Sequence, residues 1–395
     1  MNETGSPNPQ GCAPDPWITL LVLQPSPFCN INCDYCYLPN RTSTKRMAME
    51  VLEKAVERTF ASDLVQGDLT LIWHAGEPLA VPIAWYEDAI QVIRRIAPPG
   101  PQIRYSVQSN GTLINDQWCD FIQRENFCVG LSIDGPAFLH DAHRKTRRGE
   151  GTHAAAMRGL RMLRERGIPF HVISVITREA LGHAEEIYDF FESEGVERLG
   201  LNIEEVEANN MSSTLAARED ARVREFYEVM FQRQKERRTI TIREFDAARQ
   251  KVLGGVSLRD FDFPWFNEQA RPFGIVSVDW EGNFATYSPE LLSMPVDPYG
   301  TFAFGNVKTD DFCDALETPK FQKVLTDIQA GIRKCAATCS YYGYCGGGAP
   351  ANKYYENGTF ASTQTMYCRY SVQMPLEIVL SDIEKDLQLA TPSAA

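Results

Sequence analysis

The chain has 395 residues, and 39 lysines and arginines against 52 aspartates and glutamates give a net charge of −13. An acidic chain is not expected to bind nucleic acid in bulk, because the phosphate backbone attracts a basic surface. Hydrophobic residues make up 44% of the chain, and no apolar stretch approaches the roughly 20 residues of a membrane helix. We therefore expect neither a nucleic-acid partner nor a membrane partner.

In chain order, residues 1–16 are rich in Gly, Pro, Ser and Asn and are predicted to form a flexible lead-in. Amphipathic segments then alternate with short apolar runs, which predicts stacked βαβ units with functional loops at the carboxyl ends of parallel strands. Six units rather than eight predict a partial barrel, open on one side. The six strands are predicted at residues 18–23, 69–73, 103–107, 127–133, 170–176 and 198–203.

The alternation ends after a charged helix predicted at residues 217–238. Residues 274–288 are predicted to form a hairpin with a turn at residues 281–283, and the last third of the chain is rich in Gly, Tyr and Cys. We place a domain boundary near residue 240. The predicted division is a barrel at 17–240, a second domain at 241–375 and a C-terminal tail at 376–395.

Eleven cysteines are the most informative feature of the composition. The N-terminus has no basic and apolar signal region, which predicts a cytoplasmic location, where clustered cysteines indicate metal binding or redox chemistry rather than disulfides. Three cysteines fall within residues 29–36 and four within residues 335–368. The remaining four are scattered and are expected to be ordinary thiols: Cys12, Cys119, Cys128 and Cys313.

Cys29, Cys33 and Cys36 form a C-x3-C-x2-C pattern directly after the first predicted strand. Three thiolates on one loop can hold a [4Fe–4S] cluster and leave one iron open to another ligand. An open position is typical of catalytic metal sites, whereas structural sites are closed. A zinc site would need a fourth Cys or His, and none follows within about thirty residues. The pattern therefore favours an iron–sulfur cluster.

This loop resembles the signature of radical S-adenosylmethionine (SAM) enzymes, which have a partial (β/α)6 barrel. The resemblance implies that Cys29, Cys33 and Cys36 ligate a [4Fe–4S] cluster whose open iron binds the methionine moiety of SAM. It also implies that an electron from the cluster cleaves SAM to methionine and a 5′-deoxyadenosyl radical. Tyr35 is the implied contact to adenine.

Three further motifs match this family in order, each at a predicted strand end. HAGEP at residues 74–78 resembles the element that receives the SAM ammonium, with Ala75 in place of its first glycine. SNGT at 109–112 resembles the T-N-G-T-L element, and residues 132–144 resemble the stretch that contacts the ribose and the SAM carboxylate, where arginine suits a bidentate contact. The implied SAM contacts are Tyr35, Gly76, Glu77, Asn110, Ser132 and Arg144.

The second group of cysteines supplies four thiolates, which can fully ligate either zinc or an iron–sulfur cluster. Residues 339–350 resemble the SPASM extension of radical SAM enzymes, which usually carries seven cysteines and two auxiliary clusters. Ala349 stands in place of one cysteine, the predicted hairpin has none, and three residues rather than two separate the first pair. The resemblance then implies a single auxiliary [4Fe–4S] cluster, held by Cys335, Cys339, Cys345 and Cys368.

SPASM enzymes generally modify ribosomally made peptides or proteins, and this chain looks most similar to cyclophane-forming maturases of the Grr type over roughly residues 17–375. The resemblance implies an oxidoreductase that joins an aromatic ring carbon of a precursor peptide to an unactivated Cβ two residues downstream. Its implied partners are the precursor and an electron donor such as a flavodoxin or ferredoxin. Thioether formation, epimerisation and sulfatase-type maturation stay open, as does a non-catalytic protein with structural zinc sites.

The crosslinking reaction needs a base within hydrogen-bond reach of the departing ring proton. The acidic net charge favours a peptide with a basic leader, bound in a groove or along a sheet edge. Each acidic candidate has a simpler alternative interpretation as a solvated loop residue. The candidate bases are Glu204, Glu205, Asp279 and Glu281.

Overall fold

The computed structural model describes residues 18–216, 219–254 and 267–390. The predicted lead-in and Cys12 lie outside these residues. A single sheet of ten strands, in the order β10-β9-β8-β1-β2-β3-β4-β5-β6-β7, forms the centre of the fold. The strands from β8 through β1 to β7 pair in parallel, whereas β8–β9 and β9–β10 pair in antiparallel fashion. Within the described chain the end strands β10 and β7 do not pair, so the barrel stays open, as predicted.

All six strands predicted from the apolar runs are present. Parallel strands are covered on both faces, which is why these runs are almost continuously apolar. Their bounds are Leu20–Leu23 (β1), Leu69–Trp73 (β2), Ile103–Ser109 (β3), Cys128–Ser132 (β4), Phe170–Ile176 (β5) and Arg198–Ile203 (β6). The predicted α/β fold class is therefore confirmed.

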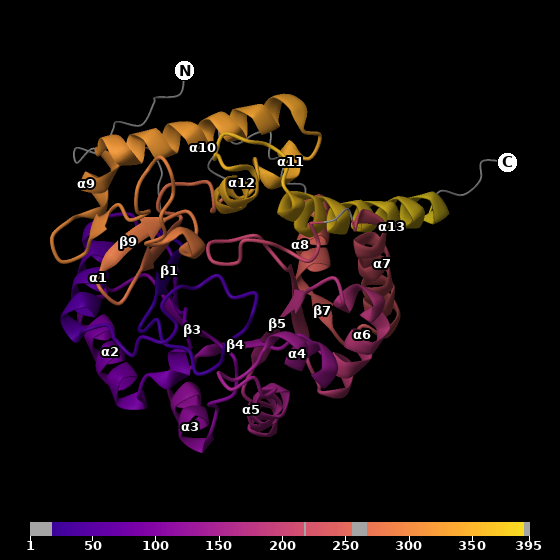
Figure 1. Cartoon of the computed structure of the whole chain (residues 1–395), viewed down its shortest axis with the longest axis horizontal. Helices are drawn as coiled ribbons and strands as arrows, with labels where there is room; N and C mark the ends of the chain where they lie inside the picture. The colour runs from indigo at the N-terminus through magenta and orange to yellow at the C-terminus, as the bar shows by residue number, and fades with distance from the viewer. Residues whose placement is uncertain (1–17, 217–218, 255–266, 391–395) are drawn as a thin grey trace.

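Helices form an outer ring around the curved sheet, and the C-terminal helices α10 and α13 close the remaining side (Figure 1). Each ring helix buries one apolar stripe against the strands; in α5, for example, Ala156, Leu160 and Leu163 are buried. The ring consists of α1 (Met49–Ala61), α2 (Ile83–Ile96), α3 (Asp116–Glu125), α4 (Ala137–His143), α5 (His153–Glu165), α6 (Ala184–Ser193), α7 (Asp220–Arg237) and α8 (Arg243–Leu253).

The predicted hairpin is formed by β8 (Ile275–Val278) and β9 (Asn283–Thr286). It is also part of the barrel sheet, because β8 pairs in parallel with β1 along its whole length. On the other side of the sheet, β7 (Thr241–Ile242) pairs with β6, and β10 (Gly305–Asn306) extends the hairpin. The sheet thus continues past residue 240, and the division of the chain into domains stays a prediction.

The C-terminal part is helical and packs back onto the barrel. Helix α13 contacts both α7 and α8. An aromatic core packs against the hairpin. In it the ring of Phe273 stacks on that of Phe312, at a centroid distance of 5.6 Å, and on that of Phe321, at 5.7 Å. The elements are α9 (Phe312–Leu316), α10 (Pro319–Thr338), α11 (Tyr342–Cys345), α12 (Pro350–Asn357), the π-helix Cys368–Gln373 and α13 (Met374–Ala390).

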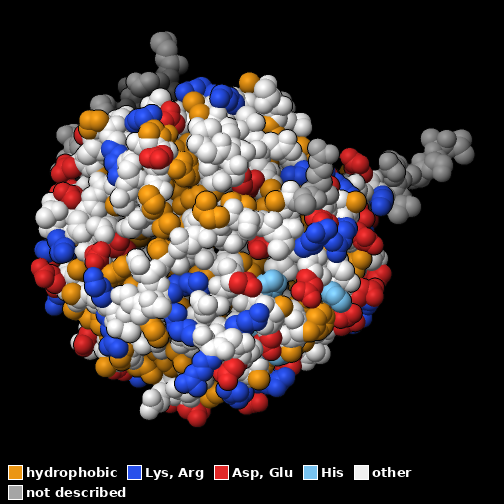
Figure 2. Space-filling view, in the orientation of Figure 1, with side chains coloured by type: hydrophobic (Ala, Val, Ile, Leu, Met, Phe, Trp, Pro, Cys, Tyr) orange, Lys and Arg blue, Asp and Glu red, His pale blue; other side chains and the backbone are white. Residues whose placement is uncertain are grey.

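The surface carries charged side chains of both signs. Figure 2 shows them over most of one face, with hydrophobic side chains gathered in part of its upper middle. No helix within the described ranges is long and apolar enough to cross a membrane.

Candidate active site

The loop that follows β1 carries the first three cysteines. Cys29 and Cys33 are buried and pack around Ile31, with Tyr35 and Cys36 beside them. Burial raises the pKa of Cys29 to about 12 and that of Cys33 to about 11. A bound metal would supply the positive charge that a buried thiolate needs, so the donor set fits metal ligation.

Arginines hold the backbone of this loop in place. Arg147 donates to the carbonyl oxygen of Cys29 at 2.7 Å, and Arg41 donates to that of Cys33 at 3.1 Å. The amide of Asp34 donates to the carbonyl oxygen of His143, the last residue of α4, and the amide of Asn32 donates to that of Lys145. The orientation of the three cysteines is therefore fixed by a segment about a hundred residues away in the chain.

The loop after β2 packs directly against the cysteine loop. Gly76 has a φ of +61°, and a Cβ there would lie 2.4 Å from the carbonyl oxygen of Phe28 and 2.7 Å from that of Ser26. The amide of Glu77 donates to the same oxygen of Phe28 at 2.7 Å. Only glycine permits this close approach. Ala75, which replaces the first glycine of the family element, also has a positive φ, of 70°.

Glu77 joins the loops after β2 and β3. Its side chain is buried and accepts hydrogen bonds from the amide of Leu79 at 2.9 Å, the hydroxyl of Ser109 at 2.8 Å and the amide of Asn110 at 2.8 Å. Burial raises its pKa to about 7, against the opposing effect of these hydrogen bonds. The side chain of Asn110 in turn donates to Asn30 at 2.9 Å and lies 3.9 Å from the sulfur of Cys29.

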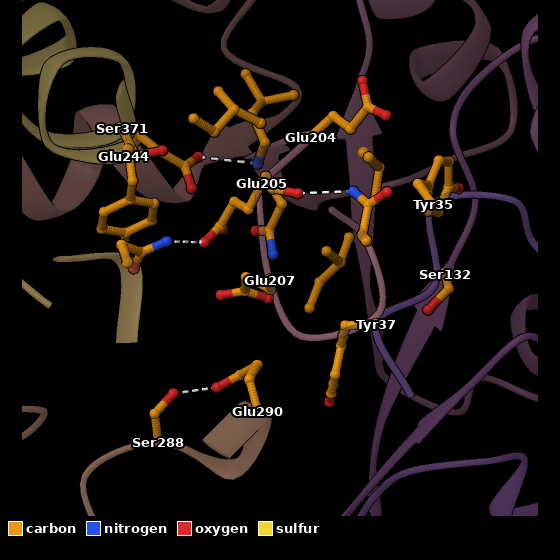
Figure 3. A pocket seen from close by; sticks show the side chains of 18 of the residues that line it. Tyr35, Tyr37, Ser132, Glu204, Glu205, Glu207, Glu244, Ser288, Glu290 and Ser371 are labelled. Carbon is orange, nitrogen blue, oxygen red and sulfur yellow. Dashed lines mark hydrogen bonds between the residues drawn. The ribbon is translucent and has the colours of Figure 1, made fainter. Parts of the chain in front are cut away.

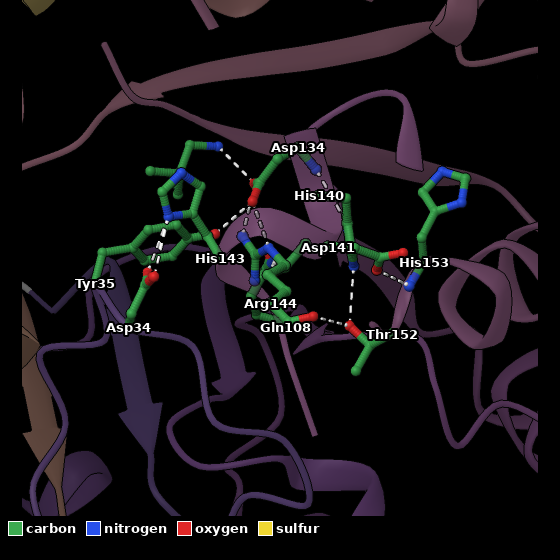
Figure 4. A network of polar contacts seen from close by, with 12 residues as sticks. Asp34, Tyr35, Gln108, Asp134, His140, Asp141, His143, Arg144, Thr152 and His153 are labelled. Atoms are coloured by element: carbon green, nitrogen blue, oxygen red, sulfur yellow. Dashed lines mark hydrogen bonds and ion pairs between the residues drawn. The ribbon is translucent and has the colours of Figure 1, made fainter. Parts of the chain in front are cut away.

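A buried ion pair joins Arg144 to Asp134, and Tyr35 is hydrogen-bonded to the same aspartate (Figure 4). Arg144 donates to both carboxylate oxygens of Asp134, at 2.9 and 3.0 Å, and the hydroxyl of Tyr35 donates to the same carboxylate at 2.5 Å. Burial alone would raise the pKa of Asp134, but the charge and hydrogen bonds of Arg144 outweigh it and lower the pKa. In this structure the guanidinium that the family resemblance assigns to the SAM carboxylate is engaged by Asp134.

Tyr35, Ser132 and Arg144 line a cavity of about 520 Å³ at the carboxyl ends of the strands. Ser132 accepts a hydrogen bond from the side chain of Gln108 at 3.0 Å. Glu204 and Glu205, from the loop after β6, line the same cavity (Figure 3). The structure thus brings two candidate bases together with three of the predicted SAM contacts.

These two glutamates differ in their surroundings. Glu204 accepts hydrogen bonds from both the amide and the hydroxyl of Thr214. Glu205 accepts a hydrogen bond from Asn352 of α12 at 2.6 Å, and burial raises its pKa to about 7. Glu205 therefore holds a proton that can exchange near neutral pH.

Asp279 and Glu281 do not line this cavity. Asp279 is buried in the hairpin turn and accepts four hydrogen bonds, from the amides of Glu281 and Asn283, the side chain of Asn283 and the hydroxyl of Ser293. Glu281 is largely exposed and forms an ion pair with Lys45 at 3.4 Å. Both residues line a separate cavity of about 300 Å³, so the structure does not bring the four candidate bases together.

Two further glutamates in the main cavity were missed by the sequence reasoning. Glu207 and Glu290 line it together with Glu205, and burial raises the pKa of both. Glu207 lies two residues after Glu205, and the criterion of a carboxylate after a strand would have found it. Glu290 follows the hairpin, and no local pattern in the sequence indicates that it faces the barrel.

The second group of cysteines lies between the C-terminal helices. Cys335 is buried in the last turn of α10, Cys345 ends α11, and Cys368 begins the π-helix, with Cys339 just beyond α10. Burial raises the pKa of Cys345, and it raises that of Cys368 to about 11.

None of these seven cysteines forms a disulfide, and neither do Cys119 and Cys128. Cys313 is disulfide-bonded, which corrects the expectation that it is an ordinary thiol. Within the described ranges no three Cys, His, Asp or Glu side chains are close enough to share one metal ion. A [4Fe–4S] cluster places each thiolate on a different iron, so its ligands need not meet at one ion.

Comparisons with known proteins agree with this arrangement. A family model described as the Radical SAM superfamily matches residues 23–191. The uncharacterized protein sll1766 of Synechocystis sp. is 41% identical over 377 residues, which are 94% of this chain and 93% of that protein. A serine-type anaerobic sulfatase-maturating enzyme of Klebsiella aerogenes is 36% identical over 182 residues, and this match spans less than half of either chain, 45% of each.

Two solved structures share the fold. The structure of native anSMEcpe with bound AdoMet has a TM-score of 0.76 at 21% identity and covers 94% of this chain and 99% of that chain. Streptococcus suis SuiB bound to the precursor peptide SuiA has a TM-score of 0.64 at 16% identity and covers 89% of this chain and 76% of that chain. The family model spans the three-cysteine loop and the strand-end motifs described above, and by this match residues 23–191 belong to the radical SAM superfamily.

Proposed function

We propose that this protein is a radical SAM maturase that acts on a ribosomally made peptide or protein. The observation that carries the proposal is the three-cysteine loop, which packs against Gly76 and Glu77 beside a cavity large enough for SAM and part of a peptide. Relatives include sulfatase-maturating enzymes, and SuiB, which shares the fold, has been solved with a precursor peptide.

The cofactor sites follow from the same loops. Cys29, Cys33 and Cys36 are the proposed ligands of the SAM-binding [4Fe–4S] cluster, and when bound this cluster and SAM supply a 5′-deoxyadenosyl radical, with an electron from a donor such as a flavodoxin or ferredoxin. Gly76, through its close contact with the cysteine loop, and Glu77, through its hydrogen bonds to Ser109 and Asn110, hold together the strand-end loops at the proposed SAM site. The proposed SAM contacts are Tyr35, Gly76, Glu77, Asn110, Ser132 and Arg144.

A single auxiliary [4Fe–4S] cluster is proposed at Cys335, Cys339, Cys345 and Cys368. Support for one cluster rather than two comes from the hairpin region. Tyr287 is buried just after β9 and its ring lies near Phe321, which stacks on Phe273, so aromatic side chains rather than cysteines occupy this region; Ala349, at the start of α12, is also buried.

The proposed reaction is cyclophane formation, a bond between an aromatic ring carbon and a Cβ of the precursor. Removal of one hydrogen atom from Cβ gives a carbon radical, which adds to the ring. The ring then loses one proton and one electron, so each crosslink removes two hydrogens in all. Glu205 is the proposed proton acceptor, because it lines the cavity and is ionised above about pH 7. Cys335, Cys339, Cys345 and Cys368 would hold the auxiliary cluster, which would supply an acceptor for that electron.

Co-expression with a small precursor encoded beside the gene tests this proposal. Mass spectrometry of the peptide is expected to show a loss of two hydrogens per crosslink, with fragments that map to an aromatic residue and a Cβ. The matched control is Cys29→Ala/Cys33→Ala/Cys36→Ala, in which the peptide stays unmodified. Linkage through a cysteine sulfur, or an inverted residue without mass change, would contradict the cyclophane reaction and support another maturation.

A second candidate is sulfatase-type maturation, which the match to the Klebsiella aerogenes enzyme favours. That reaction oxidises a cysteine or serine of the target to formylglycine. Incubation with a synthetic peptide that contains a sulfatase cysteine or serine motif distinguishes the two, because only this activity produces an aldehyde that reacts with a hydrazine probe.

A further inference from the structure

Lys353 is a buried lysine next to the second group of cysteines. Its side chain, on α12, is only 3% exposed, and its ammonium nitrogen lies 3.4 Å from the sulfur of Cys335. Among the residues that the structure describes, no ion pair joins Lys353 to a carboxylate. The sulfur of Cys335 is the polar side-chain atom that this ammonium contacts.

A buried cation is costly unless an anion lies beside it. A neutral thiol does not supply that anion. Four thiolates around a [4Fe–4S]²⁺ core do, because the assembly carries a net negative charge. The position of Lys353 is therefore one that a charged cluster would stabilise, and this supports an auxiliary cluster at this donor set.

A second donor contacts a different cysteine of the same group. Gln373, which is buried at the end of the π-helix, donates to the sulfur of Cys368 at 3.2 Å. The first cysteine loop has a different environment. There the side-chain amide of Asn110 lies 3.9 Å from the sulfur of Cys29, and Arg144, whose charge acts on Cys33, is also paired with Asp134.

Net charge and hydrogen bonds to the sulfurs set the reduction potential of an iron–sulfur cluster. Reduction adds one negative charge to the core, and a nearby cation stabilises the product. We propose that Lys353, assisted by Gln373, raises the reduction potential of the auxiliary cluster and so makes it the acceptor of the electron that the crosslinked ring loses. The ring gives up one electron and one proton, and the core changes from 2+ to 1+. This inference rests on the proposed function.

The test is a redox titration, followed by EPR, of the full-length protein with reconstituted clusters. The background variant Cys29→Ala/Cys33→Ala/Cys36→Ala leaves the auxiliary cluster as the source of the signal. Lys353→Met is expected to shift the one-electron equilibrium about tenfold toward the oxidised core, which lowers the midpoint potential by about 59 mV. Lys353→Arg keeps the charge and is expected to stay close to the parent.

Two further variants separate charge from hydrogen bonding and from folding. Lys353→Gln keeps a donor without the charge and is expected to behave like Lys353→Met. Lys334→Met removes an exposed lysine one position before Cys335 and is expected to leave the potential unchanged. If Lys353→Met does not retain its cluster, the midpoint potentials of Lys353→Gln and Lys353→Arg are compared instead. A lower potential for Lys353→Gln supports the inference, and equal potentials overturn it.

The outcomes separate this inference from the proposed function. Suppose that the background variant holds about four irons per chain and that its midpoint potential is the same with and without the Lys353 charge. This result overturns the inference about Lys353 and leaves the proposed function standing. A background variant without iron overturns the auxiliary cluster, and with it both the proposed electron acceptor and the role of Lys353.

Discussion

Ala75 is the residue at which the chain departs from the glycine-rich element that packs on the cysteine loop. It is buried and has a φ of 70°, in the left-handed region that disfavours side chains with a Cβ. The small alanine is tolerated because its neighbour Gly76, rather than Ala75 itself, makes the close contact with the backbone of Phe28.

Ala75→Gly is therefore expected to stabilise the protein. Relief of the left-handed conformation contributes about 1–2 kcal/mol, and the greater freedom of glycine in the unfolded chain offsets about 0.4–1 kcal/mol of it. The unfolding midpoint in urea measures the difference. The same exchange at Ala154, an exposed residue within α5, is the control and is expected to destabilise. A lower midpoint for Ala75→Gly would contradict the strain argument.

Glu205 gives the reaction a predicted pH dependence. Its pKa is raised to about 7 by burial, and the coupled carboxyl of Glu207 is also raised. Only the ionised form accepts a proton, so peptide modification is expected to rise as the pH increases through about 7. The folded state binds this proton more tightly than the unfolded state, in which the carboxyl has its ordinary pKa of 4.5, so the same group lowers stability as the pH rises from about 4.5 to about 7.

The variant Glu205→Gln is expected to reduce peptide modification about 10²- to 10⁴-fold, because it removes the general base. Cleavage of SAM to 5′-deoxyadenosine is expected to continue, since the side chain of Glu205 is hydrogen-bonded to Asn352 of α12 and is not one of the proposed SAM contacts. Product assays by mass spectrometry from pH 6 to 9 measure both. A variant that retains the rising pH profile would rule out Glu205 as its source, and Glu281→Gln serves as the exposed control.

At the scale of elements, the hairpin connects the barrel to the C-terminal part. Strand β8 pairs with β1 on one side and with β9 on the other, and Asp279 closes the turn between the two hairpin strands. Its four accepted hydrogen bonds make it a structural residue, although its place in the sequence suits a catalytic base equally well.

Asp279→Ala is expected to lower stability by about 2–4 kcal/mol, because several buried donors lose their acceptor. Glu281→Ala, two residues along the same turn, is expected to change stability by less than about 0.5 kcal/mol, since the side chain is exposed. Chemical denaturation followed by circular dichroism compares the two. Equal effects would contradict the assignment of Asp279 to the turn.

At the scale of the whole molecule, the two cysteine groups belong to opposite parts of the chain, and helix α13 holds these parts together. Glu377 of α13 accepts hydrogen bonds from Tyr341, which lies between Cys339 and Cys345, and from Arg369, beside Cys368. The same carboxylate pairs with Arg224 of α7. The side chain of Glu377 thereby joins the segments that carry the second cysteine group to α7 of the barrel.

Iron content is expected to report the two groups independently. Anaerobically purified protein is expected to contain about eight irons per chain, and the variant without Cys29, Cys33 and Cys36 about four. Replacement of the four C-terminal cysteines by alanine is likewise expected to leave about four. Metal analysis and absorbance near about 400 nm measure this content. Zinc in place of iron in either group would contradict the cluster assignment.

The strands and the first cysteine loop follow from local sequence. A short apolar run must be buried on both faces of a parallel sheet, and a C-x3-C-x2-C loop after such a run lies at the carboxyl edge wherever the sheet forms. For this reason the six strands, the open barrel and the position of the strand-end motifs were predictable. The continuation of the sheet into β8 was not, because it depends on pairing between segments some 250 residues apart.

The site itself is determined partly by sequence and partly by tertiary structure. Sequence alone placed Cys29, Gly76 and Asn110 in neighbouring loops, since each follows a strand of the same sheet. Tertiary structure decided that Glu205 faces the cavity whereas Asp279 closes a turn, and that Glu290 and Lys353 lie beside groups far away in the chain. The physical reason is that burial and charge pairing depend on what the fold places nearby, which no local pattern specifies.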